Sequence, residues 1–251
     1  MLDFSLIIPL FFAIISILLS RHFSHKLEKI FFMAYLRVTL QLIFLAIFLQ
    51  WIFTHQSSFL NIIILSIMII NAAYVTHGRI REKYSQKFLQ QLVSLIFVLW
   101  PMSLLGSITI YGKDFFIAQF YIPFFGLLLG NSLNTLSTGL DFYTTELRKN
   151  RNTILSLMGI GASLEEATQE IFNRSLRLGL NGNLNAMISM GIVSVPGVMT
   201  GQMLAGTSPL QAALVQIITV FFVLAGSYLG LLLALKMVQK KYFTPRGEIC
   251  F

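Results

Sequence analysis

The side chains that could contact a substrate inside the apolar parts of this chain are neutral amides. Asn131, Asn134, Asn185 and Gln202 lie in long apolar stretches, where an amide needs a protein partner because lipid offers none. Most such amides hold helices together. These four lie on the apolar segments next to the one long polar region of the chain, so we expect them to line a route, with interhelical bonding as the alternative.

The sequence predicts no catalytic residue, bound cofactor or tight metal site. His, Cys, Asp and Glu form no cluster at ligand spacing in the apolar segments, and the four histidines, at positions 22, 25, 55 and 77, lie at segment ends or in loops. Thioethers suit Cu(I) better than iron, and methionine commonly fills apolar gaps. We therefore interpret Met187, Met190, Met199 and Met203 as packing residues.

A second group of residues predicts a break in one apolar segment. Pro196 lacks a backbone N–H group, and Pro196-Gly197 can interrupt or kink a helix at mid-depth. Gly197 and Gly201 form a small-residue pair of the kind that lets helices approach closely. A broken helix is tolerated in a membrane where it lines a cavity. We expect Pro196, Gly197 and Gly201 to shape a gate or a path.

A capped polar helix precedes this segment. Ser163 and Glu166 have the spacing of a capping box, in which each side chain bonds the other's backbone N–H. Leu164, Ala167 and Ile171 then recur on one helical face. We predict a short helix over residues 163–177 that lies on the membrane surface.

The elements that position these residues are membrane spans. The 251 residues are 56% hydrophobic and 11% charged, which is too apolar for a soluble protein. Since a span needs about 20 residues, we predict an all-α, multi-pass membrane domain over residues 1–251, with a cytoplasmic region at 141–181 and seven spans, at about 2–20, 36–53, 58–76, 88–110, 115–139, 183–205 and 210–236.

The distribution of positive charge predicts the orientation. With the N-terminus outside and the C-terminus cytoplasmic, 17 of the 18 Lys and Arg residues fall on the cytoplasmic side, and Lys113 remains outside. This segregation follows the positive-inside rule. The net charge of +8 therefore faces lipid headgroups, which argues against a nucleic-acid partner. We expect the protein in the cell membrane.

The spans lack the groups that would let the chain drive transport alone. They contain no Asp, Glu, Lys or Arg well inside the hydrocarbon, whereas ion-coupled carriers use such charges. The chain also has no G-x-x-x-x-G-K-[ST] phosphate loop. A transporter of this composition needs an external motor, and the capped helix offers a place for it to attach.

Two stretches resemble a known family. Gly161-Ala162-Ser163 followed by Glu166-Ala167 resembles the cytoplasmic coupling helix of ABC-transporter permeases. Residues 193–202 (VSVPGVMTGQ) and 205–209 (AGTSP) resemble the membrane subunit of FetB-type iron-export ABC transporters, a family that includes a plant permease implicated in aluminium tolerance.

The resemblance implies a permease homodimer with a separate cytoplasmic ATPase that binds ATP and docks on residues 163–177. It also implies outward transport of iron or another metal ion. One alternative is a permease of the same architecture for an organic, lipid-like or sugar-nucleotide substrate. A membrane scaffold or enzyme is the other, although the spans contain no catalytic set.

Overall fold

The computed structural model describes residues 2–23, 27–55, 57–82 and 87–242. These residues form α-helices and one short 3-10 helix, without a β-strand, so the all-α prediction is confirmed for the described chain. The chain divides into two compact units, residues 1–56 and 57–251. Lys26, Lys83 and Arg246, which entered the charge argument, lie outside the described residues.

The first unit is a pair of helices, α1 (Leu2–His22) and α2 (Glu28–Thr54). The hydroxyl of Ser20 near the end of α1 accepts a hydrogen bond from the backbone N–H of Leu27, at 3.1 Å. The most apolar 18-residue window of α2 contains no buried residue. Because this surface is so apolar, it requires lipid or another protein around it.

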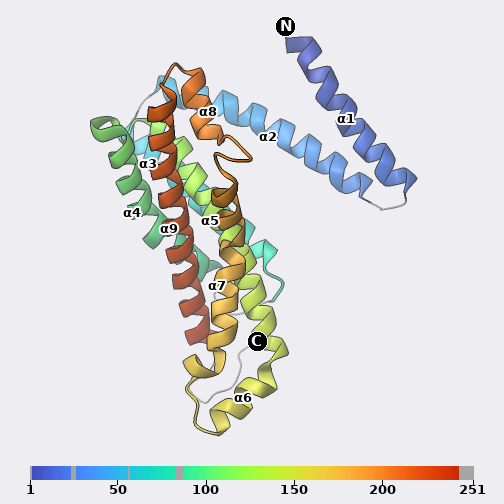
Figure 1. The fold of residues 1–251 in the computed structure, drawn as a ribbon, viewed down its shortest axis with the longest axis vertical. Helices are drawn as coiled ribbons and strands as arrows, with labels where there is room; N and C mark the ends of the chain where they lie inside the picture. Colours follow the sequence, from blue (N-terminus) through green and yellow to red (C-terminus); the bar gives the residue numbers. More distant parts are fainter. Residues whose placement is uncertain (1, 24–26, 56, 83–86, 243–251) are drawn as a thin grey trace. The chain divides into compact units, whose positions relative to one another are not determined.

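The second unit is a helical bundle built around α5 (Figure 1). Helix α5 packs against α3, α4, α7 and α9, so it forms the centre of the unit. The elements are α3 (Ser58–Arg79), α4 (Lys87–Tyr111), η1 (Gly112–Asp114), α5 (Ala118–Lys149), α6 (Arg151–Gly159), α7 (Leu164–Ser189), α8 (Gly197–Leu204) and α9 (Pro209–Tyr242).

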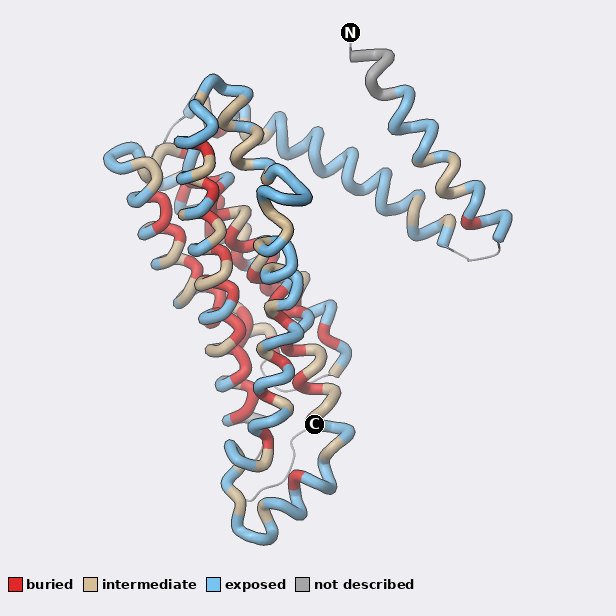
Figure 2. The backbone as a smooth tube through the Cα atoms, viewed as in Figure 1, coloured by how far each residue is buried: buried red, intermediate tan, exposed pale blue. Residues whose placement is uncertain are grey.

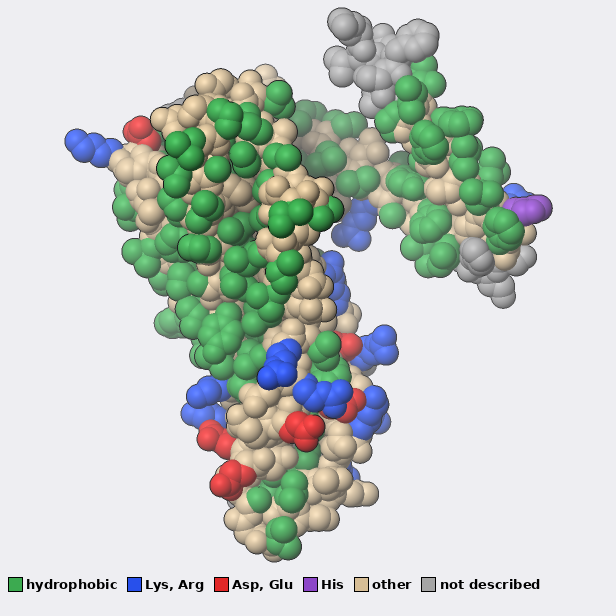
Figure 3. Space-filling model, viewed as in Figure 1, with side chains coloured by type: hydrophobic (Ala, Val, Ile, Leu, Met, Phe, Trp, Pro, Cys, Tyr) green, Lys and Arg blue, Asp and Glu red, His purple; other side chains and the backbone are tan. Residues whose placement is uncertain are grey.

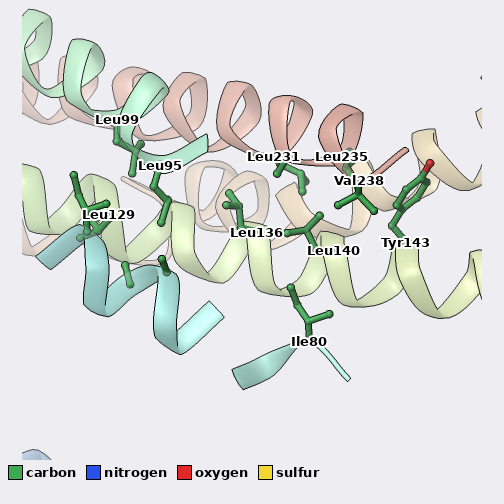
Figure 4. Close-up of a cluster of buried hydrophobic side chains, with 14 of the residues drawn as sticks. Ile80, Leu95, Leu99, Leu129, Leu136, Leu140, Tyr143, Leu231, Leu235 and Val238 are labelled. Atoms are coloured by element: carbon green, nitrogen blue, oxygen red, sulfur yellow. The ribbon is translucent and has the colours of Figure 1, made fainter. Parts of the chain in front are cut away.

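The buried residues run along α5 and the facing sides of its neighbours (Figure 2). On α5, buried side chains recur every three or four residues, which is the period of one helical face. Figure 4 shows this face meeting leucines of α4 and α9. The fully buried contributors include Tyr121, Phe125, Leu136, Leu140, Leu95, Leu99, Leu231 and Leu235.

Two glycines bring α5 and α7 into close contact. A Cβ added at Gly179 would lie 2.9 Å from the carbonyl oxygen of Thr135 and 3.3 Å from the Cα of Gly139. A Cβ at Gly139 would lie 3.2 Å from the carbonyl oxygen of Ser175 and 2.6 Å from a methyl group of Leu231. Glycine therefore permits a backbone approach that any larger residue would obstruct.

Four of the seven predicted spans, those at 36–53, 58–76, 88–110 and 210–236, coincide with helices of the described chain that are long and apolar enough to cross a membrane. Helices α2, α3 and α9, together with the segment Lys87–Asp114, are long and apolar enough to cross a membrane, and α1 contributes the shorter apolar stretch Ile7–His22. Helix α5, which covers most of the predicted span 115–139, is not among these apolar helices; its 32 residues are about 48 Å long at 1.5 Å per residue, compared with a bilayer core of about 30 Å.

The expected sixth span over residues 183–205 is not one continuous helix. Its first residues belong to the end of α7, residues 190–196 are non-helical, and α8 is a separate helix of eight residues. The predicted break is present, but it begins at Met190, six residues before Pro196. Gly191 explains the earlier position, because its backbone φ of 79° is left-handed and ends the helix.

The charged side chains of the second unit gather at the end that carries α6 (Figure 3). Contacts between residues far apart in sequence join the elements there: the Arg148 guanidinium lies 2.8 Å from the Glu82 carboxylate, and Asp141 accepts from the backbone N–H of Arg81 at 2.7 Å. Lys113 and Asp114 lie in η1, between α4 and α5. The charge-rich end is thus formed by α5, α6 and α7 together with the end of α3 and the residues that follow it.

Candidate functional site

The end of the bundle carries an exposed turn, which we call the α6–α7 tip and define as residues 155–166. Gly161 has a left-handed φ of 102°, which reverses the chain between the two helices. The Ser163 side chain then accepts from the backbone N–H of Glu166 at 3.2 Å, and the Glu166 carboxylate accepts from the Ser163 backbone N–H at 2.7 Å. The predicted capping box is therefore confirmed.

The carboxylate of Glu166 is held by this cap in its ionised form. The hydrogen bonds from the backbone N–H and then the hydroxyl of Ser163 lower the pKa of Glu166. A negative charge in the first turn also interacts favourably with the helix dipole. Glu166 thus stabilises the local structure of the tip. From the sequence alone, this role could not be distinguished from direct contact with a partner.

Apolar side chains project from the tip into solvent. Ile160 is 83% exposed, and Leu155 and Leu157 are also exposed. Ala162 is half-buried, and Gly161 and Ser163 are exposed. A group of exposed apolar side chains is typical of a surface that contacts a partner. Ile160 was missed by the sequence argument, because it lies outside the period of α7.

Helix α7 differs from the short surface helix that was expected at residues 163–177. It runs without interruption for 26 residues and packs against α5 and α9. Ala167 packs toward the core, Thr168 accepts from the side-chain amide of Gln239 at 2.8 Å, and Phe172 meets Tyr143 edge-on at 6.0 Å. The helix continues past Arg177 because Gly179 sits at the close crossing with α5.

The amides predicted to line a route have different surroundings. Asn134 is exposed and accepts from the Arg79 guanidinium at 2.8 Å, whereas Asn131 donates to a carbonyl of its own helix at 2.8 Å. Asn185 is exposed on α7. Asn183, by contrast, donates to the hydroxyl groups of Thr135 on α5 and Ser227 on α9, at 3.3 and 3.0 Å. These bonds join helices, which is the alternative role considered for the buried amides.

The residues from 190 to 204 form a folded break followed by a short helix. Three backbone N–H groups, from Ile192, Val193 and Ser194, share the carbonyl of Ser189. Pro196 is the N-cap residue of α8, and a Cβ at Gly197 or at Gly201 would meet nothing within 4 Å. The small-residue pair therefore faces no neighbour within the described chain. The side-chain oxygen of Gln202 is buried without a hydrogen-bond partner there.

Adjacent glutamines in α4 were missed by the sequence argument. Gln90 and Gln91 are 1% and 0% exposed, and none of their four side-chain polar atoms has a hydrogen-bond partner in the described structure. The available signal was two polar residues in succession within the predicted span 88–110. The described residues hold no group of three or more His, Cys, Asp or Glu that could bind a metal ion.

The apolar helices and the charge-rich end define a multi-pass helical membrane protein. Residues 3–243 match the family model described as "Uncharacterised protein family (UPF0014)", and the chain belongs to this family.

Relatives carry more specific names. The chain is 25% identical over 248 residues to the "Probable iron export permease protein FetB" of Escherichia coli, covering 98% of this chain and 93% of the relative. It is 28% identical over 214 residues to the "UPF0014 membrane protein slr1647" of Synechocystis, covering 85% and 83%. Protein ALUMINUM SENSITIVE 3 of Arabidopsis thaliana is 25% identical over 237 residues, covering 94% and 86%. The predicted family resemblance is confirmed. No solved structure matches the chain.

Proposed function

We propose that this protein is the permease subunit of an ABC transporter in the cell membrane that exports iron or another metal ion. A separate cytoplasmic ATPase docks on the α6–α7 tip, and two permease copies enclose the path. Seven segments cross the membrane, with the N-terminus outside and the tip and C-terminus in the cytoplasm. The relative named as an iron export permease supports the substrate and the direction.

The observation that carries this proposal is the continuity of α7. One helix of 26 residues, about 39 Å long at 1.5 Å per residue, begins at the capped tip and ends at the break at residue 190. The helix is packed against α5 and α9. A movement that the ATPase imposes at Ser163 is therefore transmitted as a rigid-body displacement to the non-helical segment, where a path can open or close.

The segment after α7 supports an assembly of two copies. Gly197 and Gly201 form a small-residue surface with no neighbour in the described chain, and Ile192, Val193 and Leu204 are each more than 80% exposed. Small residues allow close helix approach in membranes. In this proposal a second copy meets this surface, and Gln202, Pro196 and the exposed Asn185 face the path.

The exposed tip supports the docking role by its shape and chemistry. Ile160 lies next to the left-handed Gly161 and is the most exposed of three exposed apolar residues at the tip, with Leu155 and Leu157, so it offers an apolar anchor for a partner. Ala167 packs toward the core, and Glu166 is engaged in the cap. In this proposal these two residues set the position of the tip, while Ile160 makes the contact.

The experiment that tests the docking role compares two variants at one position. The permease is isolated in mild detergent with the wild-type residue, Ile160→Asp or Ile160→Val, and co-purifying nucleotide hydrolysis is measured. We expect an ATPase to accompany the wild type and the valine variant, which keeps the apolar anchor. The aspartate variant should lose it while remaining folded in the membrane. Equal recovery with all three would refute docking at the tip.

The alternative substrate class is organic, lipid-like or sugar-nucleotide. One observation favours keeping it: the described chain contains no cluster of metal ligands. Both substrate classes would use the same ATPase docking and the same path, so only transport assays can separate them. Such assays compare iron with organic candidate substrates.

A further inference from the structure

A groove of about 490 Å³, lined mainly by polar and charged residues, opens on the charge-rich end of the second unit. Helix α5 supplies most of its lining, and the end of α3, the residue Arg81 after it and Leu178 of α7 supply the rest. Volumes of this size are typical of small-molecule sites. The groove is lined by Arg79, Arg81, Ser137, Thr138, Asp141, Phe142, Thr145, Glu146, Lys149 and Leu178.

Both carboxylates of the groove are already engaged by positive or N–H groups. Asp141 accepts from the backbone N–H of Arg81 at 2.7 Å, and its other oxygen lies 3.9 Å from the Arg81 side chain. Glu146 accepts from Lys149 at 2.9 Å. That hydrogen bond is the largest cause that lowers the pKa of Glu146, so this carboxylate stays ionised and paired at neutral pH.

Arg79 carries the unbalanced positive charge. Among the described residues it forms no ion pair, and one of its guanidinium nitrogens donates to the neutral side-chain oxygen of Asn134 at 2.8 Å. A guanidinium has five N–H donors, so one bond to Asn134 leaves donors for a ligand. Arg174, stacked 5.5 Å from the ring centre of the lining residue Phe142, adds a further positive charge nearby.

This charge balance disfavours a bare metal cation and favours an oxyanion. The positive charge of Arg79 repels a metal cation bound in the groove. An arginine guanidinium instead binds carboxylate or phosphate oxygens with charge-assisted hydrogen bonds. The hydroxyl groups of Thr138 and Thr145 line the same groove and can donate to a second oxygen.

We propose that this groove is the cytoplasmic entry site for cargo that carries carboxylate or phosphate groups, with Arg79 as the binding residue and Asn134 as the residue that positions it. A metal ion would then be carried as an anionic complex. This inference rests on the proposed transport function. It explains how a chain whose described residues lack a metal-ligand cluster can accept a metal as cargo.

The test is equilibrium binding of radiolabelled citrate, with and without iron(III), to the full-length permease in phosphatidylcholine nanodiscs. We expect saturable binding that weakens about tenfold in Arg79→Gln, the loss typical of one charge-assisted hydrogen bond. Arg79→Lys keeps the positive charge but loses the planar guanidinium, so its affinity for citrate should lie between that of the wild type and that of Arg79→Gln. Asn134→Leu should weaken binding less than Arg79→Gln, because it leaves the guanidinium in place.

Arg151→Gln is the matched control, because Arg151 is exposed at the start of α6 and does not line the groove. It removes the same charge and should leave the affinity unchanged. Absent citrate binding, or an equal loss in Arg79→Gln and Arg151→Gln, would overturn the proposal.

A second set of nanodiscs, containing phosphatidylglycerol, separates a soluble oxyanion from a lipid headgroup. Citrate binding that persists supports an entry site for soluble cargo. Binding that anionic lipid abolishes would assign the groove to headgroups and overturn the entry site. These binding measurements contain no ATPase, so an absence of citrate binding would not affect the proposal that an ATPase docks at the tip. Conversely, if that docking proposal fails, citrate binding to the groove can still be measured.

Discussion

Alanine at Gly179 should destabilise the bundle, whereas alanine at Gly182, three residues further along the same helix, should stabilise it. The added Cβ at Gly179 would lie 2.6 Å from a methyl group of Leu231, which can move, and 2.9 Å from the carbonyl oxygen of Thr135, which belongs to the α5 backbone. A Cβ at Gly182 would meet nothing within 4 Å. Local helix propensity is the same at both sites, so the difference isolates the crossing of α5 and α7.

The two effects can be estimated from general magnitudes. Replacing a helical glycine with alanine stabilises by up to about 1 kcal/mol, which is the expected gain at Gly182. Overpacking costs about 1–3 kcal/mol, and at Gly179 it exceeds that gain because the carbonyl oxygen moves only with α5. We therefore expect Gly179→Ala to lower the free energy of unfolding by up to about 2 kcal/mol net.

Reversible unfolding of the purified protein in mixed detergent micelles, followed by circular dichroism, measures both changes. Gly182→Ala serves as the control for the general effect of alanine on α7. A Gly179→Ala variant as stable as Gly182→Ala would refute the close crossing, and with it the argument that α7 moves together with α5.

Three further predictions concern single side chains. The cap lowers the pKa of Glu166 below its usual value of 4.5, so the stabilisation by the cap is present above that pH and is lost as the pH falls through the lower folded-state pKa. Glu166→Gln should flatten this part of the pH–melting curve, and an unchanged curve would contradict the cap. Asn183→Ala should cost about 1 kcal/mol by removing two interhelical bonds, while Asn185→Ala should leave the melting temperature unchanged and reduce transport; equal destabilisation would contradict their different surroundings. Gln91→Met should raise the melting temperature, since it removes two unsatisfied buried polar atoms, and a lower value would reveal hydrogen-bond partners for the amide.

Local signals in the sequence predicted the fold class, most helix positions and the cap. The Ser163–Glu166 spacing was sufficient because a capping box depends on four consecutive residues. Long apolar stretches predicted α2, α3, α4 and α9 for the same reason, since hydropathy is a property of a single segment.

The course of α7 could not be read from local signals, because it depends on contacts with distant residues. Gly179 looks like a helix breaker in isolation, but it lies opposite Gly139 in a close crossing that stabilises a continuous helix. The break likewise begins at Met190 and Gly191 instead of Pro196. The groove escaped prediction because Arg79 and Asn134 are 55 residues apart in the sequence and meet only in the folded bundle.

The most direct test of the transport proposal is ATP-dependent accumulation in inside-out membrane vesicles that contain this permease and its ATPase. Outward export then appears as uptake into the vesicle lumen. We predict that radiolabelled iron supplied as its citrate complex accumulates only with ATP, and that Ile160→Asp abolishes accumulation while Ile160→Val retains it. Accumulation independent of ATP, or unaffected by the aspartate substitution, would contradict a permease driven through the α6–α7 tip.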